Sequence, residues 1–493
     1  MVFYSTRSRD NTASSAEAVL KGIAPDGGLY TPLDFDRMQI DVAGLLSKSA
    51  VEISAQVIGK ILDDFEPDRM RALIEAAYAG KFETEDLTPL TKVGDDFVLE
   101  LFRGPTSAFK DVALSVLPRL IVAARQELGV KDEIVILTAT SGDTGKAALE
   151  GFHDVEGTRI IVFYPDGGVS DVQKAQMVTQ AGGNVGVCAV RGNFDDAQTG
   201  VKNIFADDEA NHWAAAAGAR LSSANSINIG RLAPQVAYYF KAYCDLVLHG
   251  EIRLGDSVNF IVPTGNFGDI LAGEFARRMG LPVAKLVCAS NANNVLTDFI
   301  NTGVYDRRRA FFKTASPSMD ILVSSNLERY LFLASGGDFD LVAKLMEQLR
   351  AEGVYTAPEA LMNTMRDSFW AGCADDERAL DAIGRVWRAH EYLMYTHTAV
   401  GWAVMEDFKA REDNGWVNVV LSTASPYKFS RDVLSAISDE KPETGFGAMD
   451  RLHALSGVRV PRQLAELRDR AARFDDCVDK ADMLDYVKRA LNA

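Results

Sequence analysis

The chain has 493 residues, of which 47% are hydrophobic, so it is long enough for more than one folded core and too apolar to be disordered. Its 69 acidic and 52 basic residues give a formal net charge of −17, which argues against nucleic acid and against an anionic membrane surface as partners. We expect two or three domains, and an anionic ligand has to be attracted by local groups rather than by the overall field.

Helical patterning comes first along the chain. Over residues 43–83, apolar residues recur at helical spacing and predict an N-terminal helical domain: Ile53, Val57, Ile58, Ile61 and Leu62. From Phe97 onward, strand and helix patterns alternate, with a strand at 160–164, a helix at 172–180 and a strand at 185–190. Such alternation predicts a parallel sheet.

A lysine that follows a Gly-Pro turn is the strongest chemical feature of the sequence. Pro105 fixes its own φ and keeps the preceding glycine out of the α region, and apolar residues then recur at helical spacing as far as Leu120. Lys110 is therefore predicted to open a helix. Against Phe109 and Ala108 its ammonium loses hydration, which favours the neutral amine that attacks a carbonyl to form a Schiff base. The alternative is an exposed lysine in a first helical turn, the commoner case for a lysine considered alone.

Residues 133–149 have the pattern of a strand, a glycine loop rich in hydroxyls and the start of a helix. The loop is close to a Walker A motif, but Thr140 stands in place of a glycine and Ala147 in place of Ser or Thr, so binding of a nucleoside triphosphate is not expected. Ser141, Thr144 and the loop amides suit a small anion, such as a substrate carboxylate. The alternative is a helix N-cap without a further role.

Residues 257–276 have the same order of a buried strand, a glycine loop and an amphipathic helix, and the loop carries Gly265 and Gly268. Consecutive backbone N–H groups of such a loop, at the N-terminus of a helix, bind a dianionic phosphate without a cationic side chain. A purely structural turn is an equal alternative for this loop considered alone.

A β-branched strand at 416–421 ends in two hydroxyl residues, Ser422 and Thr423, ahead of a proline turn. A hydroxyl at the C-terminal end of a strand points toward the usual active-site crevice, where it can hydrogen-bond a pyridine nitrogen without supplying the proton that an aspartate would stabilise. A polar strand end is the alternative. Helices are predicted again in the tail, at 462–474 and 480–491.

The cysteines and histidines show no spacing that indicates a disulfide framework or a metal site. The five cysteines include no Cys-x-x-Cys pair, and the six histidines include no His-Glu-x-x-His, so we expect a reducing cytoplasm and no metal. His390 and His397 lie on one apolar, helix-like stretch, where packing is the commoner role. Neither a secretory signal nor a run of transmembrane length is present.

In their order along the chain, these segments resemble the threonine synthases, pyridoxal-phosphate enzymes of the tryptophan synthase β-like (fold type II) family. The resemblance extends to 3–7, 22–30 and 225–228 and so covers most of the chain. It implies an α/β fold of two open parallel-sheet lobes with a helical N-terminal domain and the cofactor in the cleft between the lobes. The expected division is an N-terminal domain at 1–95, a large cofactor-binding lobe at 96–132 plus 222–430, a small lobe at 133–221 and a helical tail at 431–493.

The resemblance also implies roles for individual residues. Lys110 would form the Schiff base with pyridoxal 5'-phosphate, and Thr423 would face the pyridine nitrogen. The cofactor phosphate would be held by Gly265, Asn266, Phe267 and Gly268. The substrate-binding set would be Ser141, Gly142, Asp143, Thr144, Asn225, Ser226, Asn228 and Arg231. Four positions depart from the family pattern: Arg103, Lys146, Ser425 and Tyr427. Of these, Arg103 and Lys146 are cations that either help to hold a phosphorylated substrate or are solvated, and solvation is the interpretation favoured for Lys146.

The activity implied is that of a lyase that converts O-phospho-L-homoserine and water to L-threonine and phosphate, by γ-elimination and β-addition of water, as the last step of threonine biosynthesis. Lys110 would be the base. A monomer is typical of family members of this length. Two alternatives stay open: a phospho-lyase or dehydratase of the same family that releases 2-oxobutyrate, and a non-catalytic ligand-binding relative that kept the fold.

Overall fold

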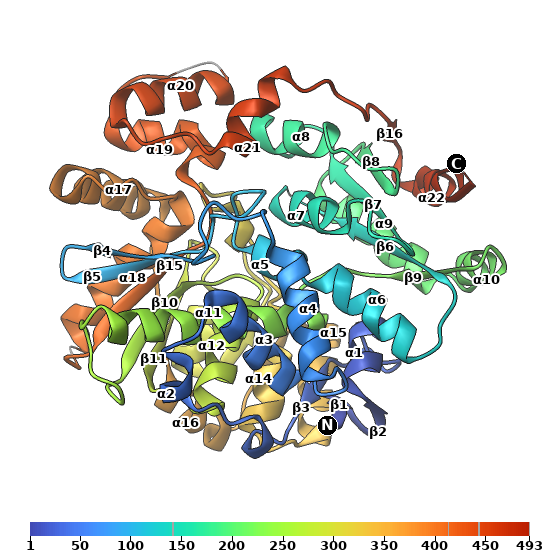
Figure 1. Ribbon diagram of the computed structural model, residues 1–493, viewed down its shortest axis with the longest axis horizontal. Helices are drawn as coiled ribbons and strands as arrows, with labels where there is room; N and C mark the ends of the chain where they lie inside the picture. The colour runs from blue at the N-terminus through green and yellow to red at the C-terminus, as the bar shows by residue number, and fades with distance from the viewer. Residues whose placement is uncertain (141, 413, 442–443, 493) are drawn as a thin grey trace.

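The computed structural model describes residues 1–140, 142–412, 414–441 and 444–492. Two open sheets form its framework (Figure 1), with six strands in one and five in the other. The six-stranded sheet defines the large lobe and the five-stranded sheet the small lobe. Over the part of the chain that the structure describes, every helix is too short or too polar to span a bilayer.

The N-terminal part combines a small antiparallel sheet with helices. The sheet has the order β2-β1-β3, from β1 (Phe3–Ser5), β2 (Ser8–Ala13) and β3 (Tyr30–Pro32). The helices are α1 (Ser15–Lys21), η1 (Asp36–Met38), α2 (Val42–Leu45), α3 (Ala50–Ile61) and α4 (Pro67–Tyr78). Ser49 caps α3 in a reciprocal pair with Glu52, and Pro67 opens α4 at a position that needs no N–H donor. The helical prediction for 43–83 is therefore confirmed as far as Tyr78.

The large sheet has the order β14-β11-β10-β15-β5-β4, and all its pairs are parallel except the β4–β5 hairpin. Its strands are β4 (Leu90–Val93), β5 (Asp96–Glu100), β10 (Val258–Pro263), β11 (Val283–Ser290), β14 (Phe369–Cys373) and β15 (Val417–Ser422). Neighbouring residues of one strand belong to different hydrophobic cores: in β10, Phe260 packs on one face of the sheet and Ile261 on the other. Both faces are covered by helices, as parallel sheets require.

One face of the large sheet carries α11 (Ile229–Leu248) and α12 (Gly268–Arg278), and the N-terminal helices pack outside them. The other face carries α17 (Asp376–His390), α18 (Thr396–Arg411), α19 (Ser430–Ile437) and α20 (Gly445–Ser456). The lobe is completed by α13 (Val295–Thr302), β12 (Val304–Asp306), η2 (Pro317–Met319), α14 (Leu327–Ala334), α15 (Phe339–Glu352), β13 (Val354–Thr356), α16 (Glu359–Ser368) and η3 (Pro426–Phe429).

The small sheet is parallel throughout, in the order β16-β8-β7-β6-β9. Its strands are β6 (Glu133–Ala139), β7 (Thr158–Pro165), β8 (Val185–Val190), β9 (Ala219–Ser222) and β16 (Cys477–Val478). One face packs on α7 (Asp143–Phe152) and α8 (Asp171–Val178), and the other on α9 (Phe194–Ala206), α10 (Asp208–Ala216) and α22 (Met483–Asn492). The short helix α5 (Lys110–Leu114), which α6 (Leu117–Glu127) follows, lies between the two sheets in Figure 1 and contacts α7.

These observations confirm the predicted fold class, two parallel-sheet lobes with a largely helical N-terminal part. The sheets depart from the expected division at two points. Strand β4 precedes residue 96 but belongs to the large sheet, and β16 lies in the expected tail but pairs with β8.

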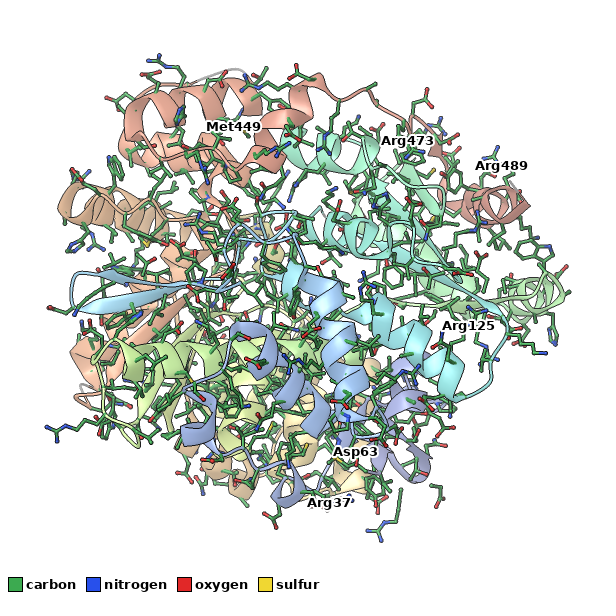
Figure 2. All side chains as sticks on the ribbon, viewed as in Figure 1. Arg37, Asp63, Arg125, Met449, Arg473 and Arg489 are labelled. Atoms are coloured by element: carbon green, nitrogen blue, oxygen red, sulfur yellow. The ribbon has the colours of Figure 1, made fainter. Side chains whose placement is uncertain are left out.

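The C-terminal tail is less helical than expected and is attached to the small lobe. Only α21 (Arg462–Ala465) and the 3-10 helix η4 (Glu466–Asp469) form within 462–474, whereas 480–491 holds η5 (Lys480–Asp482) and α22. Arg473 (Figure 2) donates a hydrogen bond of 2.6 Å to the carbonyl of Gln180, just past α8. The tail is thus fixed along the small lobe.

Candidate active site

Lys110 is the first residue of α5, as predicted, and its side chain is buried. Nζ lies 4.8 Å from the centre of the Phe109 ring, which confirms the predicted contact. Burial lowers the pKa of Lys110 to about 8, although the carboxylate of Asp143 acts in the opposite direction. Among the described residues, none accepts a hydrogen bond from the amine. A lysine in this state is ready to act as a nucleophile or a base.

The loop ahead of Lys110 is attached to the end of strand β15. The Phe109 N–H donates to the carbonyl of Thr423 at 2.8 Å, and Ala108 forms an isolated β-bridge with Ala424. The structure therefore brings Lys110 and Thr423 together, as the sequence analysis expected. The Thr423 hydroxyl has no hydrogen-bond partner in the described ranges and is free for a ligand.

The loop Gly265–Gly268 joins strand β10 to helix α12 and has the geometry of an anion cradle. Two carbonyl groups of the loop accept hydrogen bonds from the segment that precedes α14. The Ser324 hydroxyl donates to the carbonyl of Gly265 at 2.7 Å, and the backbone N–H of Asn326 donates to that of Asn266 at 3.0 Å. No acceptor in the described part of the chain pairs with the N–H groups of Gly265, Asn266, Phe267 or Gly268. Unpaired N–H groups at the N-terminus of a long helix favour an anionic group such as phosphate.

Gly265 is required by the close approach of a neighbouring segment. A Cβ atom at this position would lie 2.9 Å from the carbonyl oxygen of Ser318 and 3.3 Å from the Cα of Met319. Both atoms belong to the backbone, so neither moves aside as the end of a side chain does. At Gly268 the nearest atom to such a Cβ is Nδ2 of Asn326, at 3.4 Å, an ordinary contact.

The loop before α7 uses part of its hydrogen-bonding capacity internally. The N–H groups of Gly142 and Gly145 both donate to Thr140 Oγ1 at 2.9 Å, so they are not available to a substrate carboxylate. Gly142 has φ +135°, which excludes a side chain. Ser141 lies outside the described residues, and the Thr144 hydroxyl has no partner within them. Asp143 is buried and paired with a cation from the large lobe, so its carboxylate is not a free substrate ligand.

The segment 225–231 contains one buried cation and one structural amide. Arg231 is buried, donates to the carbonyl of Ala224 at 2.9 Å, and has its pKa lowered to about 10 by burial. Asn228 caps α11: its Oδ1 accepts the Gly230 N–H, and its Nδ2 donates to Val19 of helix α1. Its amide is thus occupied within the protein. Asn225 and Ser226 lie a little earlier, at the turn into α11, and the Cβ of Ser226 is 4.0 Å from a Cβ built on Gly268.

The four departures from the family pattern have structural roles. Lys146 is buried and contacts Gln180 and Glu150, so the interpretation that it is solvated is wrong. Arg103 bridges two carboxylates, Glu100 at 2.5 Å and Glu83 at 3.1 Å. Ser425 accepts the Tyr427 N–H at the start of η3, and the Tyr427 hydroxyl donates to the carbonyl of Val458.

Sequence reasoning missed several groups around Lys110. His397 accepts the Ser318 N–H at 3.1 Å and stacks on Tyr395, and burial lowers its pKa to about 3, so the ring is neutral. It lies in α18, whereas His390 ends α17, so the two histidines do not share a helix. Asp269 follows the anion cradle, and burial raises its pKa to about 6. Its position directly after Gly268 is the signal by which it could have been found.

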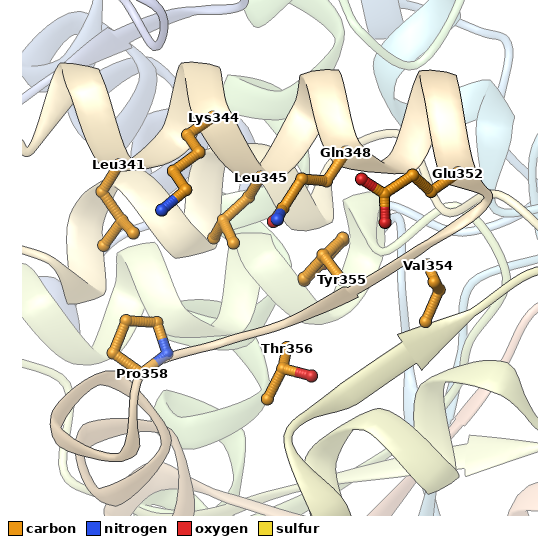
Figure 3. A pocket seen from close by; sticks show the side chains of 9 residues that line it. All are labelled: Leu341, Lys344, Leu345, Gln348, Glu352, Val354, Tyr355, Thr356 and Pro358. Atoms are coloured by element: carbon orange, nitrogen blue, oxygen red, sulfur yellow. The ribbon is translucent and has the colours of Figure 1, made fainter.

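One surface pocket of about 290 Å³ lies between helix α15 and strand β13 (Figure 3). Its walls include Lys344, Gln348, Glu352 and Tyr355. None of the groups around Lys110 lines it. Its lysine, Lys344, is exposed to solvent rather than buried, and no glycine lines the pocket, so we assign the reactive site to the region of Lys110.

Three family models match the chain: Threonine synthase N terminus at residues 2–78, Pyridoxal-phosphate dependent enzyme at 85–423, and Threonine synthase, C-terminal, at 398–489. Among curated relatives, threonine synthase-like 1 of Homo sapiens is 38% identical over 86% of this chain, and threonine synthase of Pseudomonas aeruginosa is 38% identical over 90% of this chain and 92% of the relative. The match spans 58% of the length of the threonine synthase-like 1 proteins of Pongo abelii, Homo sapiens and Macaca fascicularis, and 64% of that of Mus musculus.

The chain is also similar to solved structures of threonine synthases. The pyridoxal-phosphate-bound threonine synthase from Brucella melitensis is 36% identical, with a TM-score of 0.88 and complete coverage of both chains. A threonine synthase from yeast is 33% identical, also with a TM-score of 0.88, and the match covers 100% of this chain and 98% of that chain.

Proposed function

The chain belongs to the threonine synthase family of pyridoxal-phosphate-dependent enzymes, and on this premise we propose that it converts O-phospho-L-homoserine and water to L-threonine and phosphate. The family membership confirms the expected cofactor. The observation that carries the proposal is the buried amine of Lys110, which has a lowered pKa and no hydrogen-bond acceptor among the described residues, in a chain that also has an anion cradle. We further propose that the enzyme works as a cytoplasmic monomer on a small-molecule substrate.

The residues present fit pyridoxal phosphate. The N–H groups of 265–268, which have no acceptor in the described ranges, would hold the phosphate, and the missing side chain of Gly265 allows this loop to lie close to Ser318. Lys110 is the residue to which the aldehyde would attach. The free hydroxyl of Thr423 would hydrogen-bond the ring nitrogen, which it can do without supplying a full proton. When bound, the cofactor supplies a sink for the electrons released at the Cα and Cβ of an amino-acid substrate.

The protein's own part in the reaction is to move protons and to position the substrate. The Lys110 amine takes the Cα proton and later returns it, and its lowered pKa keeps a useful fraction of it neutral near neutral pH. Arg231 contributes a buried positive charge near that amine. Over the whole reaction, the Cγ–O bond to phosphate, one Cβ–H bond and one O–H bond of water break. The hydroxyl of water bonds to Cβ, Cγ gains a proton and becomes a methyl group, and the remaining proton leaves with phosphate. Burial of these groups keeps bulk water from the reacting carbon atoms.

Product analysis tests the proposal. Purified protein with pyridoxal phosphate and O-phospho-L-homoserine is expected to release threonine and phosphate in equal amounts, measured by amino-acid chromatography and a phosphate assay. A sample without substrate is the control. Formation of 2-oxobutyrate without threonine would instead identify a phospho-lyase. A protein that neither turns over substrate nor gains visible absorbance with the cofactor would be the non-catalytic relative.

The rate at which cofactor-free protein takes up pyridoxal phosphate is expected to level off above a pH of about 8. Below that pH the neutral fraction of Lys110 falls tenfold per pH unit, because its pKa is lowered to about 8, and above it the amine is already neutral. Stopped-flow recording of the visible absorbance between about pH 6 and 10 measures the rate. The control is a free lysine derivative, whose amine has an ordinary pKa of about 10.4. A protein rate that rises in parallel with that of the free amine contradicts the prediction.

A further inference from the structure

Lys428 joins the two lobes beside the reactive amine. It lies in η3, the next element after strand β15 of the large lobe, and its side chain is 0% exposed. Its Nζ is 2.7 Å from Oδ1 of Asp143, the first residue of α7 in the small lobe. The same Nζ donates to the carbonyl of Thr106, in the loop ahead of Lys110, at 3.2 Å. One buried ammonium thus contacts both the small lobe and the loop that carries Lys110.

Helix α8 of the small lobe repeats both contacts. Gln173 donates to the same oxygen of Asp143 at 3.0 Å, and Gln176 donates to the same carbonyl of Thr106 at 3.2 Å. Each of the two acceptors therefore receives one donor from Lys428 and one from α8. Such a shared set of buried hydrogen bonds fixes the distance between the elements that contribute to it.

The contact at Thr106 extends directly to Lys110. The backbone N–H and the hydroxyl of Thr106 both donate to the carboxylate of Asp111, at 2.8 and 2.5 Å. Asp111 is the neighbour of Lys110 in α5. A change in the position of Thr106 is therefore passed to the start of the helix that presents the reactive amine.

The pair also sets the charge around Lys110. The ionisable groups that interact electrostatically with Lys110 include Asp111, Asp143, Arg231, Asp269, His397 and Lys428. His397 is neutral because burial lowers its pKa to about 3. Asp143 raises the pKa of Lys110, whereas Lys428 lowers it. Although burial on its own would raise the pKa of Asp143, Lys428 and Lys110 hold it well below its usual range, so Asp143 is an anion.

We propose that Lys428 is a positioning residue that fixes the small lobe against the Lys110 loop and neutralises the charge of Asp143 beside the reactive amine. The inference rests on the proposed function only in naming Lys110 as the reactive group. It adds a role for a residue that contributes no atom to the cradle and no proton to the reaction.

Two substitutions of similar size, Lys428→Met and Asp143→Asn, distinguish a role in positioning and charge from a role in stability alone. In Lys428→Met, an uncompensated carboxylate remains next to Lys110, so the pH midpoint for uptake of pyridoxal phosphate is expected to move upward and the rate at pH 7 to fall by about tenfold, the equivalent of one pKa unit. In Asp143→Asn the hydrogen bonds remain but the anion is lost, so the midpoint is expected to move downward. The double variant is expected to return close to the original midpoint, since both charges are gone.

Lys146→Met is the matched control. Lys146 is another buried lysine; it lies on α7, the helix that begins with Asp143, and it pairs with Glu150. Its replacement is expected to lower the urea midpoint of unfolding, as that of Lys428 does, but to leave the titration of Lys110 unchanged. Lys428→Arg, which keeps the charge, is expected to restore most of the wild-type pH profile.

The inference is overturned if both single variants move the midpoint in one direction, if neither moves it, or if Lys146→Met moves it as much as Lys428→Met. Should Lys428→Met not fold, Asp143→Asn carries the test alone, because its midpoint has to move downward. The uptake profile needs no product to be formed. Shifts of opposite sign in a protein that makes no threonine would therefore uphold this inference and reject the proposed function.

Discussion

Replacement of Lys110 by alanine is expected to lower the turnover of O-phospho-L-homoserine by about 10⁴-fold, the upper end of what a positioned acid–base group contributes. No other lysine can take over. The other buried lysines among the described residues are paired with carboxylates: Lys146 with Glu150, Lys241 with Asp245 and Lys428 with Asp143. Lys110 alone combines burial with an amine that has no hydrogen-bond acceptor in the described ranges.

The measurement has a chemical part and a structural part. Steady-state kinetics gives the loss of turnover, and borohydride reduction of the wild-type holoenzyme followed by peptide mapping is expected to place the reduced cofactor on Lys110. Thermal unfolding of Lys110→Ala without cofactor is expected to show no loss of stability, because a buried amine without a partner is itself unfavourable. Activity like that of the wild type, or a label on a different lysine, would remove the assignment.

The parts of the site that depend on local chemistry can be predicted from the sequence. Pro105 and the helical spacing after it are enough to place Lys110 at the start of a helix. The strand, glycine loop and helix around Gly265 form from consecutive residues, so their pattern is visible along the chain. The hydroxyl of Thr423 follows a strand rich in β-branched residues that is buried from its second residue onward. In each case the informative residues are neighbours in sequence.

The parts that depend on tertiary contacts cannot be predicted in this way. Asp143 and Lys428 come from different lobes, and neither segment indicates that the other lies 2.7 Å away. Lys146 follows a polar loop and has the pattern of a solvated residue until Glu150 and Gln180 are placed around it. The family resemblance places Asn228 near the site, but only coordinates reveal that its amide caps a helix.

Short secondary-structure elements cannot be predicted from the sequence for a related reason. Strand β16 consists of Cys477–Val478, too few residues for an alternating pattern, and it forms because the edge of β8 is available to pair with it. The antiparallel strands β1 and β3 have three residues each, which is also too few for an alternating pattern to be recognised. Boundaries drawn from patterns alone therefore miss the pairing that attaches the tail to the small lobe.

Replacement of Gly265 by alanine is expected to weaken binding of pyridoxal phosphate by roughly 10- to 100-fold. The added Cβ would lie 2.9 Å from the Ser318 oxygen and 3.3 Å from the Cα of Met319, so either the cradle or the backbone behind it has to shift. Overpacking of this kind costs about 1–3 kcal/mol, and each 1.4 kcal/mol corresponds to about a factor of ten in affinity. The shift also changes the direction of the backbone N–H groups, and phosphate binding depends on that direction.

Gly268→Ala in the same cradle is the matched control for Gly265→Ala. Its Cβ would meet the side-chain amide of Asn326 at 3.4 Å and the Cβ of Ser226 at 4.0 Å, both ordinary contacts. Alanine is also favoured over glycine inside a helix, so the affinity of this variant is expected to stay within about threefold of the wild type. Titration of both cofactor-free variants with pyridoxal phosphate, followed by visible absorbance, gives the two dissociation constants. Equal losses in both variants would mean that the approach of Ser318 does not set the shape of the cradle. An unchanged affinity in Gly265→Ala would show that the phosphate is held elsewhere, because a displaced cradle cannot bind it as before.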